Sequence, residues 1–430
     1  MVINYKKISN RMVGIICCFI AIVLSIISYI TNCYTISTYL LILIAITLGF
    51  LFFNKFKLIS APVLFLLFYI YAVALGPVIL MHQNRYFSYN YQNIILVTLI
   101  CFFIGNILAT YIKKDRDKKL NIRKIKLKVK ISKENVLYLL YVVSLICSAI
   151  YFYKNRIFLF YGNIETGRID AISGNGVLLY GIQIQLLIIP MLYDIYFDKK
   201  INNLHSKKDL IILCVLICIS TCIMLFTGFR SNVMTLFVIL FIMYAGKKNI
   251  KAYKIILVGI VFVIILVILS IIRSNEELKF IQSTLASFFV NDINLQYVFN
   301  TFPSKVEFQH GYTYLINILM LRPGPDLDFT LWLKQQIGLS FSGGGVTPTI
   351  LGEFYINFGM LSMYLGMFLL GIASVKINNY FEKNNCNFLS SFYIWQFAHC
   401  ISGGIANVMI IVILFTILYT IIEMLESKKD

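Results

Sequence analysis

Residues 12–30 read MVGIICCFIAIVLSIISYI, an apolar run without a charged side chain. About 20 such residues in a helix span the hydrocarbon core of a bilayer. Similar runs recur along the 430 residues, and 59% of the chain is hydrophobic while only 13% is charged. The runs do not alternate apolar and polar residues, as the strands of a membrane β-barrel do. The sequence therefore predicts an all-α polytopic membrane protein and excludes an ordinary soluble domain.

We expect about twelve membrane-spanning helices. The first has the composition of a signal sequence, but no small-residue cleavage site follows, so we interpret it as a retained helix. No separate soluble domain is evident, so residues 1–430 are predicted to form one membrane domain. The predicted spans are 12–30, 36–53, 58–80, 93–112, 135–153, 177–197, 210–227, 231–245, 255–272, 349–375, 388–402 and 405–423.

Basic residues predict the orientation of these spans. With the N-terminus in the cytoplasm and alternating loops, 28 of the 38 Lys and Arg fall on the cytoplasmic side, as the positive-inside rule requires. Both termini are then cytoplasmic, and the basic loop 113–134 faces anionic lipid. Two large outer loops follow, 154–176 and, between the ninth and tenth spans, 273–348. Topology thus accounts for the net charge of +19, and nucleic acid is not expected as a partner.

Arginine and lysine are distributed differently. Six of nine arginines, but only four of 29 lysines, fall on the predicted outer side. A planar guanidinium holds phosphate or carboxylate at two points, so this bias indicates an anionic ligand outside; scattered solvated arginines are the alternative. The six residues are Arg85, Arg156, Arg168, Arg230, Arg273 and Arg322.

Residues 343–359 read GGGVTPTILGEFYINFG and place a carboxylate, Glu353, near the start of an apolar helix. Thr347 and Pro348 are typical of an N-cap and a first helical residue. Glu353 then lies about 7.5 Å into the helix and shares a face with Asn357, while glycines at 352, 359 and 366 favour close approach of another helix. An acid at this depth indicates function, although it could instead neutralise an outer arginine.

Arg230 lies in the stretch LFTGFRSNVMTLF, between two spans that together occupy only 36 residues, 210–245. Two full crossings need about 40 residues, so the hairpin tip should lie at or below the outer headgroups. Ser231 could cap the second helix, whose positive dipole end would share an anion site with the arginine. Snorkelling of Arg230 to a lipid phosphate is the alternative.

Further candidates lie in the two outer loops. Arg168 stands between Glu165 and Asp170, where a local salt bridge is as plausible as ligand binding. His310 is suited to act as a general base near neutral pH, or is simply solvated. Asp326 and Asp328 could hold a metal beside a diphosphate, but acids in a proline-rich loop more often form turns, and no metal is predicted. The ten cysteines are expected to be structural.

Two of these motifs resemble those of a known family. The stretch TGFRS at 227–231, followed after a large outer loop by GEFYINFG at 352–359, resembles the Wzy oligosaccharide repeat-unit polymerases, as does the layout of about a dozen spans with two outer loops. The resemblance implies a GT-C-like helical fold in the bacterial plasma membrane with the site facing outward. It also implies a glycan donor on undecaprenyl pyrophosphate, a lipid-linked acceptor and no cofactor; a chain-length regulator is a candidate partner.

In this interpretation the acceptor hydroxyl attacks the anomeric carbon and the lipid pyrophosphate leaves. Arg230, Arg168 and Arg273 are predicted to stabilise the pyrophosphate charge, with Arg156 and Arg322 as further substrate-binding arginines. Glu353 or His310 would orient or deprotonate the hydroxyl. Tyr355 and Asn357 would bind sugar.

Four alternatives remain. O-antigen ligases share the outer arginines and the loop histidine, and the GEFYINFG stretch favours a polymerase over them. A GT-C transferase using polyprenyl monophosphate would need acids in its first outer loop, which in this chain reads TNCYT. A flippase would place ionisable groups near mid-membrane, where these spans have almost none. A membrane scaffold would not need the arginine bias.

Overall fold

A computed structural model of the chain shows how these segments are arranged. It describes residues 5–30, 35–82, 89–112, 132–155, 175–204, 206–228, 230–248, 250, 253–255, 257, 259, 280–319, 328–341 and 344–424. The predicted span 255–272 therefore lies almost wholly outside the described residues, as do the basic loop 113–134 and most of the first large outer loop.

The described residues are 86% helical and contain no strand, which confirms the all-α prediction. The helices are α1 (Tyr5–Ile30), α2 (Ile36–Phe53), α3 (Ala61–Tyr69), the π-helix η1 (Ile70–Ala74), α4 (Gly76–His82), α5 (Tyr89–Ile112), α6 (Lys133–Asn155), α8 (Gly176–Gln183), α9 (Gln185–Ile201), α10 (Lys207–Phe226), α11 (Arg230–Lys248), α13 (Phe280–Thr301), α14 (Thr313–Leu319), α15 (Phe329–Ile337), α16 (Thr349–Lys383), α17 (Phe388–Gly403) and α18 (Ile405–Met424).

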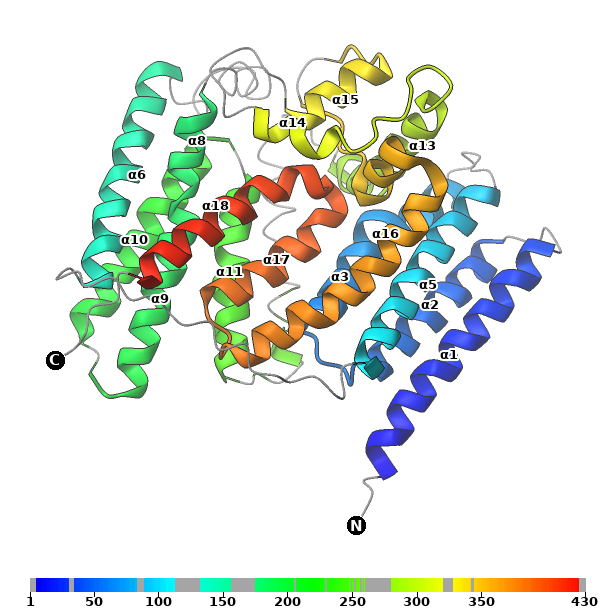
Figure 1. Cartoon of the computed structure of the whole chain (residues 1–430), viewed down its shortest axis with the longest axis horizontal. Helices are drawn as coiled ribbons and strands as arrows, with labels where there is room; N and C mark the ends of the chain where they lie inside the picture. The colour runs from blue at the N-terminus through cyan, green and yellow to red at the C-terminus, as the bar shows by residue number, and fades with distance from the viewer. Residues whose placement is uncertain are drawn as a thin grey trace.

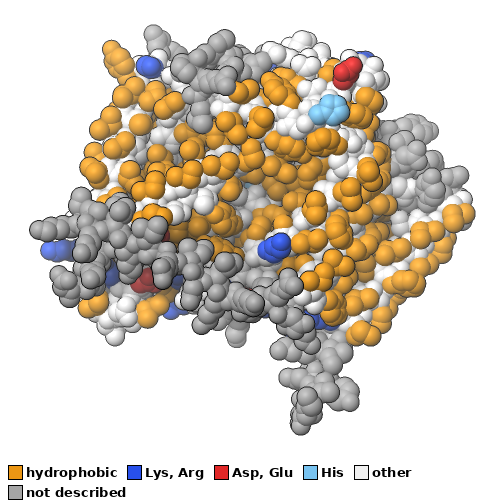
Figure 2. All heavy atoms as spheres, viewed as in Figure 1, with side chains coloured by type: hydrophobic (Ala, Val, Ile, Leu, Met, Phe, Trp, Pro, Cys, Tyr) orange, Lys and Arg blue, Asp and Glu red, His pale blue; other side chains and the backbone are white. Residues whose placement is uncertain are grey.

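Ten helical segments among the described residues are long and apolar enough to cross a membrane, which confirms a polytopic membrane protein. Helix α17, predicted as a span, has 16 residues and is shorter than these ten. Figure 1 shows the long helices side by side in one bundle, with α14 and α15 across the end opposite the start of α1. Hydrophobic side chains cover most of the face in Figure 2, and the described charges lie mainly near its upper and lower edges.

Helices α5 and α16 pack most closely through two glycines. A Cβ atom on Gly105 would lie 2.1 Å from the carbonyl oxygen of Phe368, and one on Gly371 would lie 2.1 Å from that of Phe102. The backbones therefore touch, as in small-residue contacts between membrane helices. Beside them, Asn106 Nδ2 donates to Ser374 Oγ at 3.1 Å. The glycine spacing in the sequence predicts such packing at 352, 359 and 366, and does not single out this pair.

Ion pairs among the described residues lie at the helix ends predicted to be cytoplasmic. Lys57 pairs with Glu382 at 2.7 Å and Lys199 with Glu134 at 2.8 Å. Lys133 pairs with Glu423, and Lys247 with Asp194 and Asp198. Each pair joins different helices or a helix and a loop. Some of the lysines on the predicted cytoplasmic side therefore hold helix ends together, in addition to orienting the chain in the membrane.

The segment 273–348, predicted as the second large outer loop, contains α13, α14 and α15 in its described part. Its own buried cluster includes Val298, Phe302, Phe329 and Leu333, and this cluster extends to Ile356 of α16 and Ala406 of α18. The segment is thus packed onto the membrane helices through apolar side chains.

We predict that Gly371→Leu strongly destabilises the protein, because the new side chain would be driven into the backbone of α5. Overpacking of this kind costs about 1–3 kcal/mol or more. The midpoint of thermal unfolding of the purified protein should fall by several degrees. The control is Leu369→Ala on the same helix, at a side chain that is 60% exposed. Equal midpoints for both variants would contradict the close helix contact.

Candidate functional site

The candidate site is built on α16, which begins later than predicted. Its first residue is Thr349 with Pro348 at the N-cap position, so Thr347 is not the cap and Pro348 is not the first helical residue. The capping contact comes from Thr349, whose hydroxyl accepts the N–H of Gly352 at 3.4 Å. Thr347 is instead held by α13, because its carbonyl accepts from Asn294 Nδ2 at 3.1 Å.

Helix α16 is interrupted at Gly359, where the backbone has φ 73° and ψ −163°. The positive φ favours glycine, and a Cβ there would lie 3.2 Å from the Phe308 ring. Such a break frees carbonyl groups that need donors inside a membrane. The amide of Gln309 donates to the carbonyl of Ile356 at 2.9 Å. The hydroxyl of Ser362 donates to the carbonyl of Phe354 at 2.6 Å. The large loop thus completes the broken helix.

Glu353 lies less than two turns before this break and is fully buried. Its carboxylate accepts the first amide of α18, that of Ile405, and also the amide of Ala406 at 3.0 Å. A carboxylate is stabilised at a helix N-terminus by these donors and by the helix dipole. The contact requires Gly404, where a Cβ would lie 2.5 Å from Glu353 Oε2. The described geometry therefore makes Glu353 the cap of α18.

Asn357 connects this cap to the large loop. Its Nδ2 donates to the Glu353 carbonyl at 2.8 Å and to Thr313 Oγ1 at 2.6 Å. Its Oδ1 accepts the amide of Gly311 at 2.8 Å, and its carbonyl accepts the amide of His310 at 3.1 Å. The buried side chain of Asn357 and its backbone carbonyl therefore fix the backbone on both sides of the His310–Gly311 peptide.

His310 is the exposed member of this group. Its side chain is solvent-accessible, and its ring centroid lies 6.2 Å from that of Phe358, the last residue before the break. Its backbone has φ 47°, a conformation that the two bonds to Asn357 hold in place. The structure therefore brings Glu353, Asn357 and His310 together, with the histidine toward solvent and the acid and amide inside.

The remaining predicted site residues are distributed as follows. Tyr355 is half-buried, and its hydroxyl donates to the Phe302 carbonyl at 3.2 Å. Helix α11 begins at Arg230, so Ser231 lies in its first turn and does not precede the helix as predicted; the Arg230 side chain lies outside the described atoms. The other predicted substrate-binding residues also lie outside the described ranges: Arg156, Arg168, Arg273 and Arg322.

The family model for the O-antigen polysaccharide polymerase Wzy matches residues 13–429, nearly the whole chain. The chain belongs to this family. Membership makes it a glycosyltransferase-type polymerase of O-antigen polysaccharide and confirms the resemblance drawn from TGFRS and GEFYINFG. No curated protein and no solved structure matches the sequence.

Two asparagines that sequence reasoning missed extend the polar core of this Wzy family member. Asn317 Nδ2 donates to the Ala406 carbonyl at 3.1 Å and to Asn407 Oδ1 at 2.7 Å, and Asn317 Oδ1 accepts the Phe329 amide at 2.8 Å. These bonds join α14, α15 and α18. The stretch SGGIAN at 402–407, between two apolar runs, was the available signal, since a double glycine followed by an amide side chain is typical of a turn.

Asp326 and Asp328 are the paired acids for which the sequence leaves metal binding and turn formation as alternatives. Asp326 lies outside the described residues, and Asp328 caps α15, because its Oδ1 accepts the Leu331 amide at 2.8 Å and the Thr330 hydroxyl at 2.7 Å. In the described ranges no three His, Cys, Asp or Glu side chains gather as they would around a metal ion.

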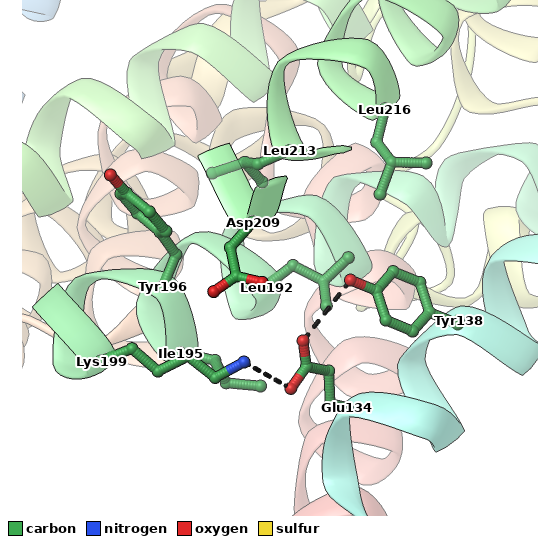
Figure 3. Close-up of a pocket in the computed structure, with 9 residues that line it drawn as sticks. All are labelled: Glu134, Tyr138, Leu192, Ile195, Tyr196, Lys199, Asp209, Leu213 and Leu216. Atoms are coloured by element: carbon green, nitrogen blue, oxygen red, sulfur yellow. Dashed lines mark hydrogen bonds and ion pairs between the residues drawn. The ribbon is translucent and has the colours of Figure 1, made fainter. Parts of the chain in front are cut away.

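A separate surface pocket lies among α6, α9 and α10 (Figure 3). Lys199 pairs with Glu134 at 2.8 Å, and the Tyr138 hydroxyl lies 3.5 Å from the same carboxylate. Tyr196, Asp209 and several leucine and isoleucine side chains line the rest. The pocket lies at the helix ends predicted to be cytoplasmic, away from α14 and α15, so we interpret its ion pair as structural.

We predict that Glu353→Ala destabilises the protein, because two buried amides lose their acceptor. Each unsatisfied buried donor costs about 1–3 kcal/mol, so the midpoint of thermal unfolding should fall by many degrees. Glu353→Gln keeps the volume and one acceptor oxygen and should lose less. The matched control is Glu307→Ala, at an exposed acid of the large loop. An unchanged midpoint for Glu353→Ala would show that the cap is dispensable.

Proposed function

We propose that the chain polymerises oligosaccharide repeat units carried on undecaprenyl pyrophosphate at the outer face of the bacterial plasma membrane. The acceptor hydroxyl forms a new bond to the anomeric carbon of the donor glycan. The bond from that carbon to the pyrophosphate oxygen breaks, and the hydroxyl proton passes to a base on the protein. Family membership over residues 13–429 is the observation that carries the proposal.

The orientation of the reaction is supported by the charge distribution and by the position of the polar core. Asn317, Asn357 and Glu353 all lie where α14, the start of α16 and the start of α18 meet. This is the end of the bundle opposite the start of α1 (Figure 1), and the lysine-rich segments are predicted at the other end. A lipid-linked substrate would present its pyrophosphate and sugars at this level.

His310 is the better of the two predicted bases. A general base must reach the hydroxyl whose proton it takes, and His310 is exposed while Glu353 is buried with backbone donors on both oxygens. We therefore assign proton transfer to His310 and positioning to Glu353 and Asn357. Tyr355, with its hydroxyl on a loop carbonyl, would line the sugar site.

The arginines are assigned to the pyrophosphate. The leaving diphosphate accumulates negative charge, and fixed guanidinium groups stabilise it without reorganisation. Arg230, at the first residue of α11, would also benefit from the positive end of that helix. Arg168 and Arg273 would assist it, with Arg156 and Arg322 holding the substrate more loosely.

The proposal is tested by glycan ladders from cells with and without the gene. Loss of the gene should leave single lipid-linked repeat units on the outer side and no long polymer. The wild-type gene should restore the ladder, and Arg230→Ala should not, at equal membrane level. Finished polymer left unattached would indicate a ligase, and units trapped in the cytoplasmic leaflet would indicate a flippase. A full ladder from the Arg230 variant would overturn the role assigned to that residue.

The choice of base is tested by comparing His310→Ala with Glu353→Gln. Loss of a general base slows a reaction by about 100- to 10,000-fold. We expect His310→Ala to lower polymer formation to this extent without changing the thermal unfolding midpoint. Glu353→Gln should lower the midpoint in proportion to its loss of polymer. A fully active His310→Ala variant would rule out proton transfer by His310.

A further inference from the structure

Helix α13 of the large loop carries three polar residues close together that face the membrane helices: Asn291, Asp292 and Asn294. The candidate site on α16 does not use Asp292. Asn291 and Asn294 hold the chain before α16, because Thr347 Oγ1 donates to Asn291 Oδ1 at 3.2 Å and Asn294 Nδ2 donates to the Thr347 carbonyl at 3.1 Å. On this side α13 therefore fixes where α16 begins.

On its other side α13 contacts an interruption in the third span. The π-helix η1 follows α3, and Pro77, at the second position of α4, cannot donate a backbone hydrogen bond. Two carbonyls of η1 receive side-chain donors instead. Asn291 Nδ2 donates to the Ala72 carbonyl at 3.1 Å, and the Tyr39 hydroxyl donates to the Ala74 carbonyl at 2.9 Å.

Asp292 fills the space at this interruption. Its side chain is 1% exposed, and a Cβ on Gly76 would lie 1.6 Å from its Oδ2, so the carboxyl group occupies the position that only glycine leaves open. Oδ1 accepts the Tyr91 hydroxyl at 2.7 Å. Oδ2 has no hydrogen-bond partner among the described residues.

The surroundings of Asp292 do not suit a negative charge. Its titratable neighbours in the described part of the chain are phenols, Tyr91 on α5, Tyr39 on α2 and Tyr69 on α3, and no described cation pairs with it. A buried carboxylate with a single donor is costly and is normally neutralised by taking up a proton. Burial accordingly raises the pKa of Asp292 well above its ordinary value.

We propose that Asp292 is a positioning residue that works as a neutral carboxylic acid, locking α13 between the interrupted third span and the start of α16. In that role it holds the segment that places Thr347, and through α16 it holds Glu353, Asn357 and His310. Its effect on polymer formation rests on the proposed function; its effect on the structure does not.

The structural test compares Asp292→Asn with Asp292→Ala in the purified full-length protein. Asparagine is isosteric and neutral, so we expect an unfolding midpoint within a few degrees of wild type and unchanged hydrogen exchange in α13. Alanine removes the carboxyl oxygen that accepts the Tyr91 hydroxyl and leaves a cavity at Gly76, so exchange in α13 should rise at least tenfold or the protein should fail to fold. An Asp292→Asn protein as unstable as Asp292→Ala would overturn the proposal.

A pH series tests the neutral form directly. A carboxyl whose folded pKa is raised stabilises the protein fully below its unfolded pKa of about 4, and this contribution is lost as the pH rises toward the folded value. Between pH 5 and 8 the wild-type midpoint should therefore fall relative to that of Asp292→Asn. The control is Glu307→Gln, an exposed acid of the same loop, which should follow wild type. A constant difference between wild type and Asp292→Asn would show that Asp292 is ionised in the fold.

Polymer ladders separate this proposal from the proposed function. If Asp292→Asn keeps the wild-type ladder and Asp292→Ala loses it, the neutral positioning role is supported. A stable Asp292→Asn protein without polymer would show that the charge itself is needed in the reaction, which overturns the neutral positioning role. If the chain does not use the proposed lipid-linked repeat units, the ladders give no information on Asp292, and the midpoint and hydrogen-exchange results still decide its role.

Discussion

The bond between the Glu353 carboxylate and the first amides of α18 is the constraint on which the rest of the site depends. It buries a carboxyl group in the interior, which is tolerable because two backbone amides donate to it and a helix dipole faces it. It also fixes the angle between α17 and α18, since the turn at Gly404 must leave room for the carboxylate. The start of α16 and the start of α18 are therefore held as one unit.

Asn357 connects this ordered unit to the exposed loop that carries His310. One helical turn separates it from Glu353, so both side chains share a face. Its amide group and carbonyl together hold the backbone of His310 and Gly311. An exposed loop histidine would otherwise sample many positions, and for the base proposed above this order would avoid an entropic cost during the reaction. In the proposed function, Asn357 would therefore act through the residue that it holds.

The sequence predicted the fold class, most spans and the grouping of Glu353 with Asn357, because hydrophobic run length and helical period are local properties. It did not predict the break at Gly359, since a glycine inside an apolar run looks the same in straight and interrupted helices. The glycine contact of Gly105 with α16 depends on which helices become neighbours. The partners of Glu353 were also out of reach, because backbone amides 52 residues away leave no mark in side-chain pattern.

One segment of the chain completes two interruptions in the membrane helices and also contacts the start of α18. The carbonyl of Ala72 in η1 receives Asn291, the carbonyls at the Gly359 break receive Gln309 and His310, and the carbonyl of Ala406 after the Gly404 turn receives Asn317. Non-helical backbone at membrane depth persists only where protein or water satisfies it. The segment from α13 to α15 is therefore a structural part of the membrane domain. Because this segment supplies donors at both breaks and to the first turn of α18, the polar core around Glu353 and Asn357 can form only where this segment lies.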